Sequence, residues 1–98
     1  MNFTEFGRKI LPCGTIVYSY MLCSGGYMIK ITNLDTSEER CTAGVNVNRD
    51  YISVFMTNLM DNDITADNMD TFLMNELNNY FELYPPKAKR IQRKYLYL

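Results

Sequence analysis

Four oxygen-bearing side chains have the spacing of the first half of a calcium-binding loop. They stand at what would be positions 1, 3, 5 and 7 of such a loop: Asp61, Asp63, Thr65 and Asp67. The rest of the stretch departs from that pattern, because Ala66 stands where the loop needs glycine and Phe72 where it needs a bidentate glutamate. Acids at the start of a helix also interact favourably with its dipole. We therefore expect these acids to cap a helix and not to bind a metal.

The other reactive side chains lack the partners that catalysis requires. The chain has no histidine, the residue most often used as a general base. Its three cysteines, Cys13, Cys23 and Cys41, have no C-x-x-C spacing, which indicates reduced thiols and not a zinc or disulfide site. The glycine pair Gly25-Gly26 is too short for a phosphate-binding loop and suits a hairpin turn. The sequence therefore predicts no enzyme, no cofactor and no metal.

Charge is divided unevenly along a chain whose formal net charge is only −1. Residues 50–86 hold seven acids and neither lysine nor arginine: Asp50, Asp61, Asp63, Asp67, Asp70, Glu76 and Glu82. Residues 87–98 hold five bases and no acid: Lys87, Lys89, Arg90, Arg93 and Lys94. One interpretation is that the basic segment folds back onto the acidic one, in surface pairs that each contribute little to stability. The other is that one of the two segments binds a partner.

The acidic segment favours a partner protein with a basic surface. Complementary potentials of this kind speed encounter and fix the register of binding. The residues expected to make the contact are Asp61, Asp63, Asp67, Asp70 and Glu82. In this hypothesis the protein is a non-enzymatic binder or inhibitor that imitates the charge of a nucleic acid and covers a nucleic-acid-binding effector.

The basic segment supports a second hypothesis, a small nucleic-acid-binding module. Cations mixed with aromatic residues suit phosphate contact combined with base stacking. The residues involved would be Lys87, Lys89, Arg90, Arg93, Lys94 and Tyr95. A third hypothesis is a self-associating structural protein, a homodimer formed through the exposed edge of the meander or through a strand in the C-terminal segment.

The elements that would carry these residues have the pattern of an α+β domain. Residues 15–23, 27–33 and 40–47 alternate with period two, which predicts a three-stranded antiparallel meander. In the third strand, Cys41, Ala43, Val45 and Val47 are expected on one side. The period then changes to 3.6, which predicts two covering helices. The first runs from the N-cap Asn48 to about Met60, with a stripe of Ile52, Phe55, Met56, Leu59 and Met60. The second is capped by Thr65 or Asp67, with a stripe of Met69, Phe72, Leu73, Leu77, Tyr80 and Tyr84.

The two ends of the chain give weaker patterns. Phe3, Phe6 and Ile10 are spaced by three and four residues, which predicts a short helix before Pro12. Residues 87–98 suit either a helix or a fourth strand, and we favour the strand. The chain shows no repeat or linker and no apolar run of membrane-spanning length. We expect a single domain over residues 1–98, located in the cytoplasm and not in a membrane.

In composition the chain resembles the small inhibitors that phages encode against bacterial defence, anti-CRISPR proteins among them. The features that it shares with them are its small size, residues with AT-rich codons, missing catalytic groups and an acidic helical face. The resemblance is one of composition and includes no residue-level motif. It implies a phage or mobile-element protein that acts by binding a host effector.

Overall fold

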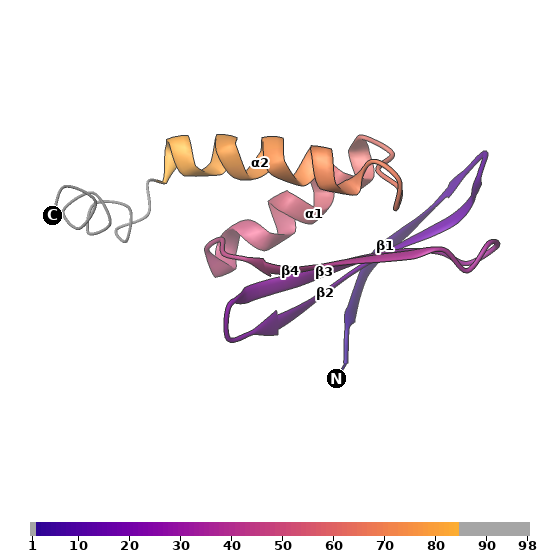
Figure 1. Cartoon of the computed structure of the whole chain (residues 1–98), viewed down its shortest axis with the longest axis horizontal. Coiled ribbons are helices and arrows are strands. Elements are labelled where there is room, and N and C mark those ends of the chain that lie inside the picture. The colour runs from indigo at the N-terminus through magenta and orange to yellow at the C-terminus, as the bar shows by residue number, and fades with distance from the viewer. Residues whose placement is uncertain (1, 85–98) are drawn as a thin grey trace, which may run out of the picture.

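The computed structural model describes residues 2–84 and has an α+β architecture (Figure 1). Four strands form one antiparallel sheet in the order β1-β2-β3-β4: β1 (Thr4–Leu11), β2 (Gly14–Cys23), β3 (Gly26–Asn33) and β4 (Glu39–Val45). A 3₁₀ turn, η1 (Arg49–Tyr51), leads into α1 (Ile52–Asp61), and α2 (Met69–Leu83) follows. Both helices lie on the same side of the sheet. The predicted fold class is therefore confirmed, with one strand more than the meander that we expected.

That extra strand replaces the predicted N-terminal helix, which is wrong. Residues 4–11 pair with β2 along almost their whole length, and a helix of two turns has too few hydrogen bonds to compete with that pairing. A bulge between Glu5 and Gly7 inserts Phe6 into the strand, where it packs against the core, whereas Ile10 is 83% exposed. The three apolar residues of the predicted helix therefore share no apolar face. At Gly7 the end of the Met60 side chain lies directly on the strand, since a Cβ there would be 2.8 Å from Met60 Sδ.

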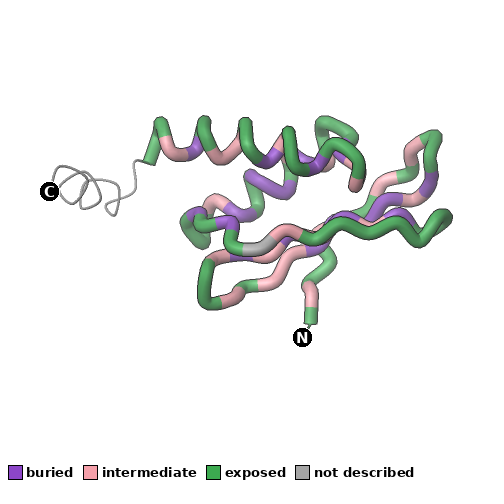
Figure 2. Tube along the Cα trace, in the orientation of Figure 1, coloured by how far each residue is buried: buried purple, intermediate pink, exposed green. Residues whose placement is uncertain are grey.

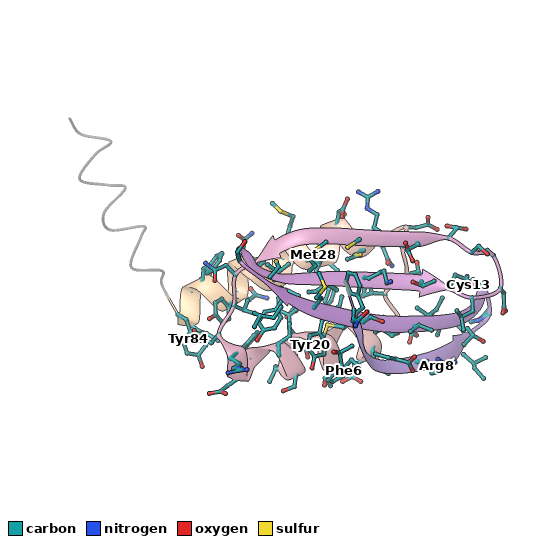
Figure 3. The ribbon with its side chains drawn as sticks, turned by 90° about the horizontal axis from the view of Figure 1, so that it is seen from below. Phe6, Arg8, Cys13, Tyr20, Met28 and Tyr84 are labelled. Carbon is teal, nitrogen blue, oxygen red and sulfur yellow. The ribbon has the colours of Figure 1, made fainter. Side chains whose placement is uncertain are left out.

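The core lies between the sheet and the helices (Figure 2). β2 and β3 contribute alternate residues to it, including Ile16, Tyr18, Ile29 and Ile31, all at most 1% exposed. Neither α1 nor α2 lies on the opposite face of the sheet, which is seen in Figure 3, where Arg8 and Met28 are labelled. Charged pairs lie on this face, among them Arg8 with Glu5 and Lys30 with Glu39.

Strand β4 does not keep the single alternation that we expected. Val45 pairs with Tyr27, but after a bulge Thr42 pairs with Ile29 and Cys41 with Lys30. The prediction that Cys41 shares a side with Val45 is therefore wrong, because Cys41 lies on the face of Lys30. Gly44, with a φ of 69°, provides the backbone conformation at this bulge.

The helical stripes are confirmed in their centres and differ at their ends. Ile52, Phe55, Met56 and Leu59 of α1 are buried, as are Met69, Leu73 and Tyr80 of α2. Asn48 does precede the helical segment, but its first turn is the 3₁₀ turn η1 and the Asn48 side chain makes no capping hydrogen bond. Tyr84 was expected in the buried stripe and is 49% exposed. The predicted strand in residues 87–98 lies outside the described residues.

Among residues 2–84, no helix combines the length and the apolar character that crossing a membrane requires.

Candidate partner-binding surface

The connection between α1 and α2 is built as a helix C-terminal cap. The N–H of Ile64 donates to Leu59 O at 3.1 Å, and the N–H of Asp63 donates to Met60 O at 3.1 Å. These two bonds define a Schellman motif, in which the residue after the cap takes a left-handed conformation. Asp63 takes that position with a φ of 54°. Ile64 is 5% exposed and supplies the apolar contact that accompanies the motif.

Side chains of the sheet hold the α1–α2 connection in place. Lys9 Nζ donates to Met60 O at 2.8 Å and forms an ion pair with the Asp63 carboxylate. A cation at the C-terminal end of a helix is favoured by its dipole. The Tyr18 hydroxyl donates to Ile64 O at 2.7 Å, and burial, with the nearby Asp63 charge, raises the pKa of Tyr18 to about 12.

The acids of the connection do not converge as calcium ligands would. The Asp63 carboxylate pairs with Lys9. The described residues contain no group of three or more acidic or cysteine side chains placed to hold a metal ion. The predicted helix caps Thr65 and Asp67 are wrong, since α2 begins after Asn68. Asn68 Oδ1 instead accepts the Thr65 N–H at 2.8 Å, which closes the turn before the helix.

The structure divides the five acids predicted to bind a partner into two locations. Asp61, Asp63, Asp67 and Asp70 lie at or beside the α1–α2 connection, whereas Glu82 lies near the far end of α2. Glu82 stands twelve positions after Asp70 in the helix, or about 18 Å away at 1.5 Å per residue. The five residues therefore form an extended acidic surface and not one cluster.

Two of these acids are partly neutralised by cations of the sheet. Asp63 pairs with Lys9 of β1, and Asp70 pairs with Arg40 of β4. No ion pair within the described part of the chain involves Asp61, Asp67 or Glu82. Within residues 2–84, the sheet thus reduces the charge at Asp63 and Asp70 and not at Asp61, Asp67 or Glu82.

The outward side of α2 forms a continuous exposed arc, which we call the α2 arc. Its members repeat in pairs every four residues: Asp70, Thr71, Met74, Asn75, Asn78, Asn79, Glu82 and Leu83. Met74 is 63% exposed and Leu83 is 69% exposed. The arc thus combines two carboxylates, three amides and two apolar side chains, without a cation. Sequence reasoning found its acids but not Met74 or Leu83 as surface residues.

An aromatic cluster lies at the end of the helix pair remote from the α1–α2 connection. The sequence did not lead us to predict it as a surface feature. Tyr51 packs against Tyr80, Tyr84 and Phe55, with ring centroids 4.7, 6.2 and 6.3 Å away. Its pKa is raised by burial and by the charge of Glu76. The Tyr80 hydroxyl accepts the Asn48 N–H at 2.7 Å. The signal for this cluster was present in the sequence, because Tyr51 with Phe55 and Tyr80 with Tyr84 are each spaced by four residues.

The three thiols lie apart from this surface. Cys13 and Cys41 are exposed and Cys23 is half-buried, and all three are reduced. Desolvation raises the pKa of Cys41, which keeps it protonated and less nucleophilic at neutral pH. The residues predicted to bind nucleic acid, Lys87 to Tyr95, lie outside the described residues.

Comparison with known proteins adds no relative to this description: no protein-family model, curated protein or solved structure matches the chain.

Proposed function

We propose that this chain is a small non-enzymatic binding protein that docks the α2 arc, together with Asp61 and Asp67, on a basic surface of a partner protein. The observation that carries the proposal is the charge of the helical segment. Residues 50–84 contain seven acids and no cation. The two of these acids that pair with cations of the sheet are Asp63 and Asp70, at or beside the α1–α2 connection.

The composition of the α2 arc suits a specific interface and not only a diffuse negative field. Met74 and Leu83 offer exposed apolar area, and methionine is an adaptable contact residue. Asn75, Asn78 and Asn79 offer both donors and acceptors, as the edges of nucleic acid bases do. The partner that fits best is a protein whose basic surface normally binds nucleic acid. The chain would inhibit it by occupancy, as the phage-encoded inhibitors of host defence that it resembles in composition do.

Affinity capture from a host-like lysate, with and without nuclease, tests this proposal. We expect the tagged chain to retain one partner protein in both conditions. The variant Asp67→Lys/Glu82→Lys should lose at least about tenfold in capture, because two charges that attract the partner then repel it. Capture that disappears on nuclease treatment would contradict the proposal and favour the nucleic-acid module with Lys87 to Tyr95.

A matched control comes from the turn between β3 and β4. Asp35 and Glu38 are exposed acids in that turn, which Asn33 links to Cys13 O by a 3.1 Å hydrogen bond. Cys13 lies at the opposite end of the molecule from Tyr84 (Figure 3). The variant Asp35→Lys/Glu38→Lys changes the net charge by the same amount and should capture the partner as the unmodified chain does. Equal losses in both variants would show that total charge matters and that the α2 arc does not.

A further inference from the structure

An open cavity of about 450 Å³ lies where the start of α1 meets the end of α2. Its lining residues are Asn48, Asp50, Tyr51, Val54 and Tyr84. Tyr84 and Val54 are about half exposed, at 49% and 46%. Figure 3 shows Tyr84 at the end of the molecule remote from Cys13. The cavity is therefore on the surface, at the end of α2 that also carries Glu82.

Two tyrosine rings form the aromatic walls of this cavity. The Tyr51 and Tyr84 ring centroids are 6.2 Å apart and the ring planes meet at 67°, so the rings stand as two sides of a corner. Tyr80 fixes both from behind, with centroids 4.7 Å from Tyr51 and 5.0 Å from Tyr84. Tyr80 is itself held, since it is 4% exposed and its hydroxyl accepts the Asn48 N–H. A flat group that stacks on one of these rings would stand at about 67° to the other.

Within residues 2–84, carboxylates lie at and near the corner. Asp50 lines the cavity with an exposed carboxylate. Glu76 acts on Tyr51 from α2, where it also accepts a hydrogen bond from Asn58 Nδ2 at 3.1 Å. Arg49 is the cation nearest in sequence, and it is not among the lining residues. Aromatic faces beside carboxylates attract cations, and a planar guanidinium can stack on a ring while it pairs with a carboxylate.

We infer that this corner, with Tyr51 and Tyr84 as walls and Asp50 as counter-ion, receives an arginine side chain of the partner protein. This inference rests on the proposed function, because it names the anchor by which a basic surface would be held. The α2 arc would guide the approach, and the corner would fix the position of one residue. Arginine fits better than lysine because its guanidinium is planar and can stack and form a hydrogen bond at once.

Titration of the isotope-labelled full chain with a short arginine peptide tests the inference directly, followed by NMR of the tyrosine ring signals. The matched ligand is the same peptide with citrulline, which has the shape of arginine without its charge. We expect saturable shifts of the Tyr51 and Tyr84 signals with the arginine peptide and about fivefold weaker binding or none with citrulline. Equal binding of the two peptides, tighter binding of a lysine peptide, or no saturable shift would overturn the inference. Contacts of the corner with Arg90 or Arg93 of the same chain would also overturn it, since the occupant would then not be the partner.

Substitutions distinguish the contribution of the tyrosine rings to arginine binding from that of the Asp50 carboxylate. Tyr84→Leu should weaken arginine binding about threefold or more, and Tyr84→Phe, which keeps the ring, should weaken it less than Tyr84→Leu does. Asp50→Asn should weaken binding about twofold or more, and Asp35→Asn on the remote turn should not change it. Unchanged binding by Tyr84→Leu would remove the corner as a site.

Capture of the partner protein by these variants distinguishes this inference from the proposed function. If Tyr84→Leu captures the partner normally while Asp67→Lys/Glu82→Lys does not, the proposed function stands and the arginine corner is wrong. If the corner binds the arginine peptide but no partner protein is captured, the proposed function is wrong.

Discussion

At the scale of single residues, the sheet and the helix connection are joined through a few polar contacts. Tyr18 of β2 is fully buried, and its hydroxyl reaches the carbonyl of Ile64, itself part of the cap that ends α1. Lys9 of β1 contacts the same cap at Met60 O. These contacts set the direction in which α2 leaves the connection. The position of the α2 arc therefore depends on residues that face the core and not the partner.

The Tyr18 hydroxyl gives a prediction about pH. Because burial raises the pKa of Tyr18 from 10.0 to about 12, the folded chain keeps this proton where the unfolded chain loses it. The contribution of Tyr18 to the free energy of unfolding is complete below pH 10 and falls between pH 10 and about 12. The free energy of unfolding, measured with urea at both ends of this pH range, should therefore fall more for the unmodified chain than for Tyr18→Phe.

Tyr18→Phe should itself lower the free energy of unfolding at pH 7 by about 1–2 kcal/mol, because Ile64 O then loses its hydrogen bond. Comparison with the Phe variant removes the effect of the other seven tyrosines, which both chains share. If the free energies of unfolding of the two chains fell in parallel above pH 10, the raised pKa would not belong to Tyr18.

At the scale of elements, periodicity predicted the strands and helices where one pattern runs without interruption. The strands β2 and β3 and the buried stripes of α1 and α2 follow from alternation and from 3.6-residue spacing. The failures are at bulges. Phe6 in β1 and Gly44 in β4 each lie at a one-residue shift of register, and the shift in β4 places Cys41 on the face opposite to the predicted one. Local spacing cannot show such shifts, because they depend on the pairing partner.

The hairpin between β2 and β3 offers a test of how these elements are held together. Gly26 has a φ of 117°, and a Cβ there would lie 2.5 Å from Val45 O of β4. Gly26→Ala should therefore lower the free energy of unfolding by about 2 kcal/mol or more, since both the backbone conformation and the pairing with β4 are disturbed. Chemical denaturation measures this change. Gly25→Ala is the matched control, because its Cβ would meet nothing closer than Gly44 Cα at 3.9 Å, and equal effects of the two changes would contradict the steric explanation.

At the scale of the whole molecule, the distribution of charge matters more than its sum. Five of the ten bases lie beyond residue 86, so residues 2–84 hold five bases against all eleven acids of the chain. The uneven charge made it possible to predict the candidate site as an acidic segment. The four-residue spacing of the tyrosines and the place of Met74 and Leu83 outside the buried stripe are visible in the sequence. The corner between Tyr51 and Tyr84 is not, because its ring geometry depends on how the two helices meet.

This distribution predicts how salt affects binding once the partner has been captured. Attraction between the acidic α2 arc and a basic surface acts before contact, so salt should act chiefly on association. Between about 20 and 500 mM NaCl, the association rate constant measured by stopped flow should fall about tenfold or more, while the dissociation rate constant changes much less. Asp67→Asn/Glu82→Gln should flatten this dependence, whereas Asp35→Asn/Glu38→Gln should leave it nearly as steep. An association rate that is independent of salt would mean that the partner is held by Met74, Leu83 and the tyrosine corner, and that the acids are only the solvated face of a helix.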